Sequence, residues 1–257
     1  MKLFLASVAI AIITIPLQAA DKPAMDNRLF EMRIYTAAPG KLDALNARFK
    51  NHTIKLFEKH GMVNIGYWVP IDNADNKLYY VIAHKDRAAR DASFKAFAAD
   101  PAWKEAAAAS EKDGKLVTKI EQHFLTATDF SPAIKLGAGA KDRVFELRIY
   151  TATEGNLEAL NSRFRDHTVK LFTKHGMTNF CYWNLAKGEK NADKMLIYLL
   201  AHDSVEAAKK SFDAFRLDPD WLAARTASEK KAGGSLTAAK DGVVSIFMKA
   251  TDYSQTK

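Results

Sequence analysis

Two histidines, His52 and His167, are the side chains of this sequence best suited to moving a proton. Each falls on an apolar stripe that recurs at three- and four-residue steps along a predicted helix, as Phe49 and Leu56 do around His52. The stripe predicts that both imidazoles point between a helix and a sheet. A neutral imidazole there could act as a general base or donate to a ligand, because its proton affinity lies near ambient pH. The alternative is a core histidine that binds a backbone carbonyl or a tyrosine.

A second set of candidates lies on one face of two predicted strands. It comprises Glu31, Arg33 and Tyr35 in one strand and Glu146, Arg148 and Tyr150 in the other. A strand has a period of two, so this polar face is opposite an apolar face, which we expect to meet the helices. The polar face should then enter an interface between two sheets, where charges persist only when paired. There it would form either an ion-pair ladder that fixes domain pairing or a polar cavity that binds a ligand.

A third set lies on and beside aromatic strands. It comprises Asn64, Trp68 and His84 with their counterparts Asn179, Trp183 and His202. Alternation places Asn64 on the same face as Trp68, with Tyr67 on the opposite face. An amide beside an indole could line a small pocket, and core packing is the alternative. His84 and His202 end their strands, where each could join His52 or His167 at one site.

Other catalytic and metal-binding patterns do not occur in the sequence. It contains no HExxH, CxxC or GxSxG. Cys181 is the only cysteine, and Gly66 stands at its place in the repeat described next, so we interpret it as buried filler rather than a shared catalytic thiol. We therefore predict no metal site, no cofactor and no hydrolase chemistry.

The candidates come in pairs because the chain is a duplication. One stretch begins RLFEMRIYTAAPGKLDALNARF at Arg28 and ends HGMVNIGYW at Trp68. It returns as RVFELRIYTATEGNLEALNSRF at Arg143 and ends HGMTNFCYW at Trp183. A repeat this long indicates tandem domains rather than solenoid turns. We assign residues 26–131 to a first copy, residues 132–141 to a linker and residues 142–255 to a second copy.

Each copy has the predicted order strand, helix, strand, strand, helix, strand. In the first copy these elements are expected at residues 29–36, 41–60, 62–69, 78–84, 85–98 with a helix restart at 100–101, and 116–128. That order is the ferredoxin-like pattern of an α+β domain, in which helices cover one face of an antiparallel sheet. The other face of each sheet needs a cover, and the other copy can supply it.

Four features of each copy resemble the NIPSNAP family. They are the Phe-Glu-x-Arg-Ile-Tyr-Thr opening, the helical histidine, the His-Gly-Met before an aromatic strand and the later Asp-Pro-x-Trp. The resemblance implies the dimeric α/β barrel architecture, in which two ferredoxin-like domains pair their sheets. Here both domains would come from one chain. The family implies no single settled reaction.

Residues 1–20, MKLFLASVAIAIITIPLQAA, combine a lysine, an apolar run and small residues suited to cleavage. This is typical of a secretory signal peptide, so we predict a periplasmic or secreted protein with no stable membrane span after cleavage. The net charge is +8, but the lysines are interleaved with acidic residues and form no basic run with aromatic side chains. We therefore predict no nucleic-acid partner.

Two classes of function fit these features. The first is a binding module for a small, partly apolar ligand or for a protein partner. The second is a cofactor-independent monooxygenase-like or isomerase-like enzyme, as found on the implied architecture, in which His52 or His167 moves a proton. A further homo-oligomer is compatible with both classes, and fold analogy alone cannot decide function.

Overall fold

The computed structural model describes residues 25–137 and 142–257, so the predicted signal peptide and residues 138–141 of the predicted linker lie outside the described part. The first copy contains β1 (Leu29–Ala37), α1 (Leu42–Arg48), η1 (Phe49–Thr53), α2 (Ile54–Lys59), β2 (Val63–Pro70), β3 (Lys77–His84), α3 (Arg87–Ala99), α4 (Pro101–Ser110) and β4 (Val117–Ala127). The second copy contains β5 (Val144–Thr151), α5 (Leu157–Arg163), η2 (Phe164–Thr168), α6 (Val169–Lys174), β6 (Thr178–Leu185), β7 (Met195–His202), α7 (Val205–Leu217), α8 (Pro219–Ala232) and β8 (Val243–Ala250). The predicted order of strands and helices is confirmed in both copies.

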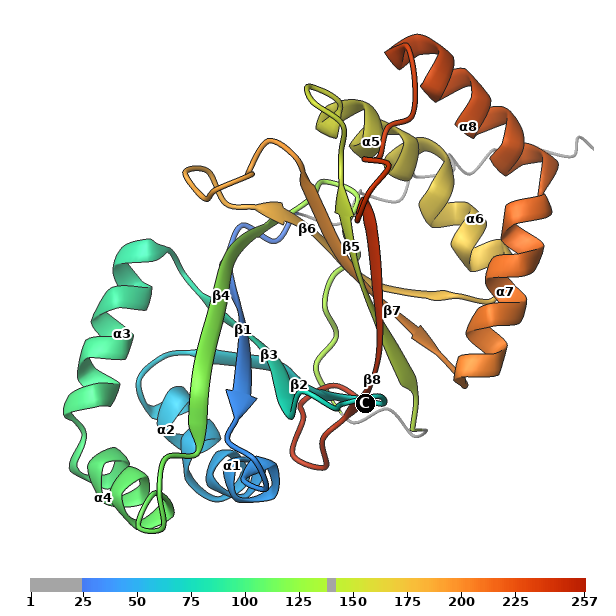
Figure 1. Cartoon of the computed structure of the whole chain (residues 1–257). Coiled ribbons are helices and arrows are strands. Elements are labelled where there is room, and N and C mark those ends of the chain that lie inside the picture. Colours follow the sequence, from blue (N-terminus) through green and yellow to red (C-terminus); the bar gives the residue numbers. More distant parts are fainter. Residues whose placement is uncertain (1–24, 138–141) are drawn as a thin grey trace, which may run out of the picture.

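The strands close into one antiparallel barrel in the order β1-β3-β2-β8-β5-β7-β6-β4. Each copy contributes one sheet, and two seams join the sheets, because β2 pairs with β8 and β4 pairs with β6. The helices of the two copies lie on opposite sides of the barrel (Figure 1). The predicted pairing of two ferredoxin-like sheets within one chain is thereby confirmed.

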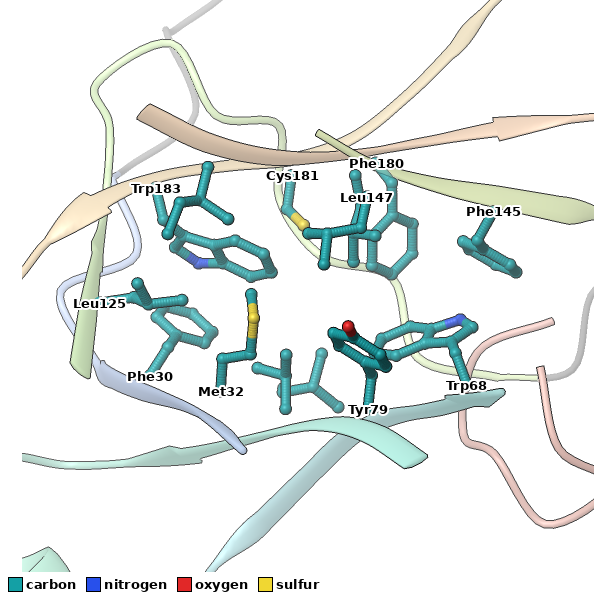
Figure 2. Packing of buried hydrophobic residues seen from close by; sticks show 14 of the residues in the cluster. Phe30, Met32, Trp68, Tyr79, Leu125, Phe145, Leu147, Phe180, Cys181 and Trp183 are labelled. Carbon is teal, nitrogen blue, oxygen red and sulfur yellow. The ribbon is translucent and has the colours of Figure 1, made fainter. Parts of the chain in front are cut away.

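The apolar face of each sheet points into the barrel, whereas the sequence suggested that it meets the helices. Phe30 and Met32 from β1 share one buried cluster with Phe145 and Leu147 from β5 (Figure 2). A closed barrel has no open edge, so the side of each sheet that faces the interior is the side best shielded from water. The purely apolar side chains therefore lie on that side. The prediction that the polar face enters the interface between the sheets is therefore wrong. The residues concerned are Glu31, Arg33, Tyr35, Glu146, Arg148 and Tyr150, and they face the helices.

Cys181 lies in the same interior cluster and is fully buried. Burial raises the pKa of its thiol well above the usual value, so the group stays protonated at neutral pH. Its interpretation as buried filler is confirmed.

A second layer of core lies between each sheet and its helices and is rich in aromatic rings. In the first copy it contains Leu45, Phe49, Phe57, Tyr67, Tyr80 and Phe97, and the second copy repeats it.

Trp103, just after the Asp-Pro that opens α4, packs on Phe97 with ring centroids 4.4 Å apart. Asp100 caps α4, because its side chain accepts a hydrogen bond from the Ala102 amide at 2.9 Å.

The long first helix of each copy contains one π-turn, at Phe49–Thr53 and Phe164–Thr168. A π-turn inserts one extra residue, so it rotates the following side chains by about 100° relative to an uninterrupted α-helix. The Thr53 hydroxyl donates to the carbonyl of Arg48 at 3.2 Å, and the second copy repeats this contact at 3.1 Å. The inserted residue breaks the predicted apolar stripe at His52.

A β-bulge begins at Asn64 in β2, and β6 has the same irregularity. The extra residue changes which side chains share a face. Asn64 and Tyr67 are hydrogen-bonded to each other on the helix side, whereas Trp68 lies in the barrel interior. The predicted sharing of one face by Asn64 and Trp68, and by Asn179 and Trp183, is therefore wrong.

Candidate functional site

A cavity of about 230 Å³ lies between the helices and the sheet of the first copy, and we call it the inner cavity. Its lining is mainly aromatic and comprises Tyr35, Arg48, Phe49, Thr53, Phe57, Phe94, Phe97, Trp103, Ala107, Glu111, Val117 and Ile120. An apolar, partly enclosed space with a few convergent polar groups is the usual form of a small-ligand site. The inner cavity is therefore the first candidate for one.

Ring contacts fix the aromatic walls of the inner cavity. Phe57 contacts Phe97 with ring centroids 5.0 Å apart. Tyr35 meets Phe49 edge to face at 5.9 Å. Tilted and edge-to-face pairs are favoured arrangements of aromatic side chains, so the walls keep a defined shape.

Arg48 brings a buried positive charge to the lining of the inner cavity. Its Nη1 donates to Glu111 at 3.0 Å and to the Ser110 hydroxyl at 3.3 Å. Its guanidinium also lies over the Trp103 ring, 5.3 Å from the centroid. Within residues 25–137 and 142–257, the buried Nε of Arg48 has no hydrogen-bond partner. Arg48 therefore keeps a donor that a bound molecule can satisfy.

A buried charged cluster borders the inner cavity, and Arg33 connects the two. Its guanidinium carbon lies 5.5 Å from the ring centroid of Tyr35 and 5.1 Å from that of Phe94, and both rings line the cavity. Arg33 Nη2 also donates to the Tyr35 hydroxyl at 3.3 Å. The arginine therefore holds the tyrosine in place in the cavity wall.

Glu31 is the centre of this charged cluster and is fully buried. Its carboxylate accepts hydrogen bonds from Arg33 at 2.5 Å and from Arg90 of α3 at 2.9 and 3.0 Å. His84 Nε2 lies 3.3 Å from the same carboxylate. Burial raises the pKa of Glu31, but the neighbouring His84, Arg90 and Arg33 outweigh burial and lower the pKa to about 2. The expected pairing of Glu31 with Arg33 is therefore present, but it lies on the helix side of one sheet and within one copy, so the expectation that it fixes the pairing of the two domains is wrong.

The second copy keeps the buried carboxylate but changes its partners. Glu146 accepts from Arg148 at 2.5 Å and from Ser245 at 2.6 Å. His202 Nε2 lies at hydrogen-bond distance, 3.1 Å, from the other carboxylate oxygen. Where the first copy has its second arginine, four residues after the N-cap of the helix, this copy has Ala208. The carboxylate of the second copy is therefore paired with one arginine instead of two.

Polar atoms are less completely paired in the first copy. In the second copy, Arg148 Nε donates to the Tyr198 hydroxyl at 2.9 Å. Among the described residues, the equivalent Arg33 Nε and Tyr80 hydroxyl have no hydrogen-bond partner, nor do the two ring nitrogens of His84, whose approach to the carboxylate lacks hydrogen-bond geometry. Each unpaired buried group costs about 1–3 kcal/mol, and a function or a bound molecule often explains it. The first copy is therefore the better candidate for a ligand site.

His52 and His167 are exposed, because the π-turns rotate them away from the sheets. They line surface grooves between the first and last helices of their copies. Their predicted position between helix and sheet is wrong. The predicted site that combines them with His84 or His202 does not form, since those two histidines are buried on the helix-facing side of the sheets.

Asn64 anchors its helix to the sheet. Its Nδ2 donates to the carbonyl of Ile54, just after the π-turn, at 3.2 Å, and its Oδ1 accepts from the Tyr67 hydroxyl at 2.5 Å. Asn179 makes the equivalent contacts in the second copy.

Of the predicted ligand-binding residues, Tyr35 lines the inner cavity. Arg33 does not line it but donates a hydrogen bond to the Tyr35 hydroxyl.

Sequence analysis missed Arg48 and Arg90. Arg48 recurs as Arg163, in each copy four residues before the helical histidine, and this repetition was a signal that could have been used. A helical arginine is usually solvated, so its repetition alone does not mark it as a site residue. Arg90 is not repeated and belongs to no motif, so only its contact with Glu31 reveals it.

Across residues 25–137 and 142–257, no three His, Cys, Asp or Glu side chains gather as ligands for a metal ion. The helices of the same ranges include none long and apolar enough to cross a membrane.

Three solved structures share the fold over most of the chain. A candidate monooxygenase from Fusobacterium nucleatum has a TM-score of 0.59 at 8% identity, covering 90% of this chain and 95% of that one. A candidate monooxygenase from Lactobacillus acidophilus has a TM-score of 0.55 at 13% identity, covering 88% and 94%. An anthrone oxidase-like protein has a TM-score of 0.55 at 15% identity, covering 88% and 92%. At these identities the likeness shows the fold alone.

No curated protein matches the chain. The sequence does match one family, and it matches that family twice. The family model for NIPSNAP matches residues 30–132 and again residues 145–255. These segments take in both ferredoxin-like units of the barrel and most of the chain. The chain therefore belongs to the NIPSNAP family, as two NIPSNAP domains in tandem.

Proposed function

We propose that this protein is an exported binding protein that holds a small, partly apolar ligand in the inner cavity. The main support for this proposal is the cavity itself, which combines aromatic walls of defined shape with a buried arginine. The cavity also lies in the first copy, where more of the buried polar atoms lack a hydrogen-bond partner. Its volume of about 230 Å³ lies below the range of about 300–1,000 Å³ that is usual for ligand sites, so the ligand must be small.

The lining defines the chemistry of the ligand. Six of the lining side chains are aromatic, namely Tyr35, Phe49, Phe57, Phe94, Phe97 and Trp103, and these favour a flat apolar body. Glu111 already neutralises Arg48 through the contact at 3.0 Å. The polar group of the ligand is therefore a neutral acceptor, such as a carbonyl or a phenol, rather than a second carboxylate.

An enzyme that uses His52 or His167 as its acid or base is less well supported than a binding protein. Both imidazoles face solvent, and neither lines the inner cavity. The oxygenase names belong to the similar structures and carry only their fold to this chain. The proposal therefore includes binding without turnover.

A variant that fills the inner cavity tests the proposal. Ala107 lines the cavity, so Ala107→Leu should displace the ligand. We expect native mass spectrometry of protein purified from the exported fraction to show a bound small molecule in the wild type and little or none in this variant. Ala108→Leu is the matched control, because Ala108 is the next residue of α4 and is exposed. Equal ligand content in both variants and in the wild type would argue against the inner cavity.

Export is a separate part of the proposal. The charged start, apolar run and small-residue end of residues 1–20 support cleavage near Ala20 or Asp21. The intact mass of protein from the periplasm or medium should lack those residues. A mass that still includes Met1 would contradict export through a cleaved signal peptide.

A further inference from the structure

The second copy carries an open groove of about 350 Å³ on its outer surface, between α5 and α8. We call it the outer groove. Its walls are largely alanine, including Ala159, Ala224 and Ala227, and its charged lining groups include Arg163, Lys231 and Asp166. The outer groove is separate from the inner cavity, which belongs to the first copy, and the inference below does not rest on the function proposed for that cavity.

Arg163 is a buried charge in the lining of the outer groove. Its side chain is 5% exposed. Among the described residues, its Nε and Nη1 have no hydrogen-bond partner. The guanidinium lies over the Trp221 ring, 5.1 Å from the centroid, which holds it in place. Burial lowers the pKa of Arg163, and the charge of Glu229 offsets burial only in part.

A competing arginine explains why Arg163 has no hydrogen bond to Glu229. Glu229 Oε1 lies 3.6 Å from Arg163 Nη1, beyond hydrogen-bond distance. The carboxylate of Glu229 instead accepts from Nε of Arg225, one turn earlier in α8, at 3.1 and 3.3 Å. Arg225 therefore takes the hydrogen bonds of the carboxylate that would otherwise pair closely with Arg163.

The first copy provides an internal comparison. There the equivalent Arg48 donates to the equivalent Glu111 at 3.0 Å. The position of Arg225 is occupied by Ala107, which has no charge with which to compete. The same two helices thus present an arginine that is hydrogen-bonded to its glutamate in one copy and an arginine with only a long ion-pair contact, at 3.6 Å, in the other.

We propose that the outer groove binds a small carboxylic acid with an apolar body, whose carboxylate pairs with Arg163. A carboxylate matches the guanidinium in charge and geometry and supplies the hydrogen bonds that Arg163 lacks. Lys231 adds a second positive charge to the lining, where the first copy has Asp113 at the equivalent position. The alanine walls cover the apolar body, and Asp166 disfavours a second acidic group on the ligand.

Binding of 4-fluorobenzoate, followed by fluorine NMR titration of the full mature chain, tests this proposal. The neutral 4-fluorobenzamide is the control probe, because it has the same shape without the charge. We expect saturable binding of the acid and at least tenfold weaker binding of the amide. Equal affinity for the two probes would overturn the proposal.

Three variants locate the site. Arg163→Gln should weaken binding of the acid at least tenfold. Arg225→Ala should do the same without removing a groove residue, because the released Glu229 can then neutralise Arg163 as Glu111 neutralises Arg48. Arg225 is exposed, so this variant keeps the test decisive even if Arg163→Gln does not fold. Arg48→Gln, the matched change in the first copy, should leave binding unchanged.

The result also separates this site from the inner cavity. Arg48 and Ala107 line the inner cavity and not the outer groove. If the probe binds in the inner cavity, Arg48→Gln and Ala107→Leu will weaken its binding and Arg225→Ala will not, and that outcome overturns the proposal. Unchanged binding in both Arg163→Gln and Arg225→Ala overturns it as well.

Discussion

Buried charged residues between sheet and helices are stabilised by their partners rather than by water. Glu31 is fully buried and still ionised, because two arginines donate to it from different elements, Arg33 on its own strand and Arg90 on α3. A buried ion pair adds little net stability, but removal of one partner leaves an uncompensated charge and costs about 3–5 kcal/mol. Glu31 is therefore the residue of the cluster whose loss leaves the most charge unbalanced.

Glu31→Gln should lower the free energy of unfolding by about 3–5 kcal/mol at pH 7, because Arg33 and Arg90 lose their carboxylate. It should also flatten the pH dependence. The pKa of Glu31 falls from 4.5 to about 2 on folding, so its contribution is present above pH 4.5 and disappears as the pH falls toward 2. Linkage gives that contribution a size of about 3 kcal/mol.

Urea unfolding between pH 2 and pH 7 measures both effects of the Glu31 change. Glu105→Gln is the control, because Glu105 is exposed on α4, and it should follow the wild type. If Glu31→Gln loses stability with falling pH as steeply as the wild type, the carboxylate is not the group that titrates.

At the scale of the elements, the π-turn decides which side chains face the sheet. Phe49 and Thr53 at its two ends are buried, while His52 between them is exposed. Because the turn recurs at the same place in the second copy, the outward position of the histidine is a property of the repeat.

Two neighbouring substitutions test the phase of this turn. His52→Ala should change the free energy of unfolding by no more than about 0.5 kcal/mol, since the side chain is exposed. Thr53→Val should cost about 1 kcal/mol, because the buried hydroxyl that donates to Arg48 is lost. Thermal or urea unfolding of the two variants and of His167→Ala and Thr168→Val measures this. A larger loss for the histidine than for the threonine would place the imidazole in the core after all.

Single inserted residues mark the limit of prediction from the sequence. The repeat and the periodicity predicted the elements, their order and the paired sheets, because each rests on a pattern spread over many residues. A π-turn and a β-bulge each add one residue without a motif, so they displaced His52 and Asn64 from the faces that regular periods assign. The prediction of which sheet face meets the helices was wrong for another reason. A period shows that Phe30 and Glu31 lie on opposite faces but not which face meets the helices.

At the scale of the whole molecule, each copy completes the other. The end of the first copy crosses to the second, where the Thr128 amide donates to the Tyr182 carbonyl at 3.0 Å. The end of the second copy crosses back, and the Thr251 amide donates to the Tyr67 carbonyl at 2.9 Å. Tyr253 then packs on Tyr67 with ring centroids 5.4 Å apart. Together with the two seams, these crossings tie the aromatic core of each copy to the other copy's tail.

One copy expressed alone should therefore not persist as a monomer. Residues 25–131 would expose the barrel face of their sheet, including Phe30, Met32 and Trp68, and the unpaired edge of β2 would be free to pair with another chain. We expect a homodimer in which two first copies exchange their tails, or aggregation where the exchange fails. Size-exclusion chromatography with light scattering distinguishes these states, and residues 142–257 alone provide the matched case. The same exchange predicts that mixing the two separate halves yields a 1:1 complex, whose melting temperature rises with protein concentration because no linker joins the halves. A soluble, cooperatively folded monomer of either half would show that the closed barrel is not required for the sheet to fold.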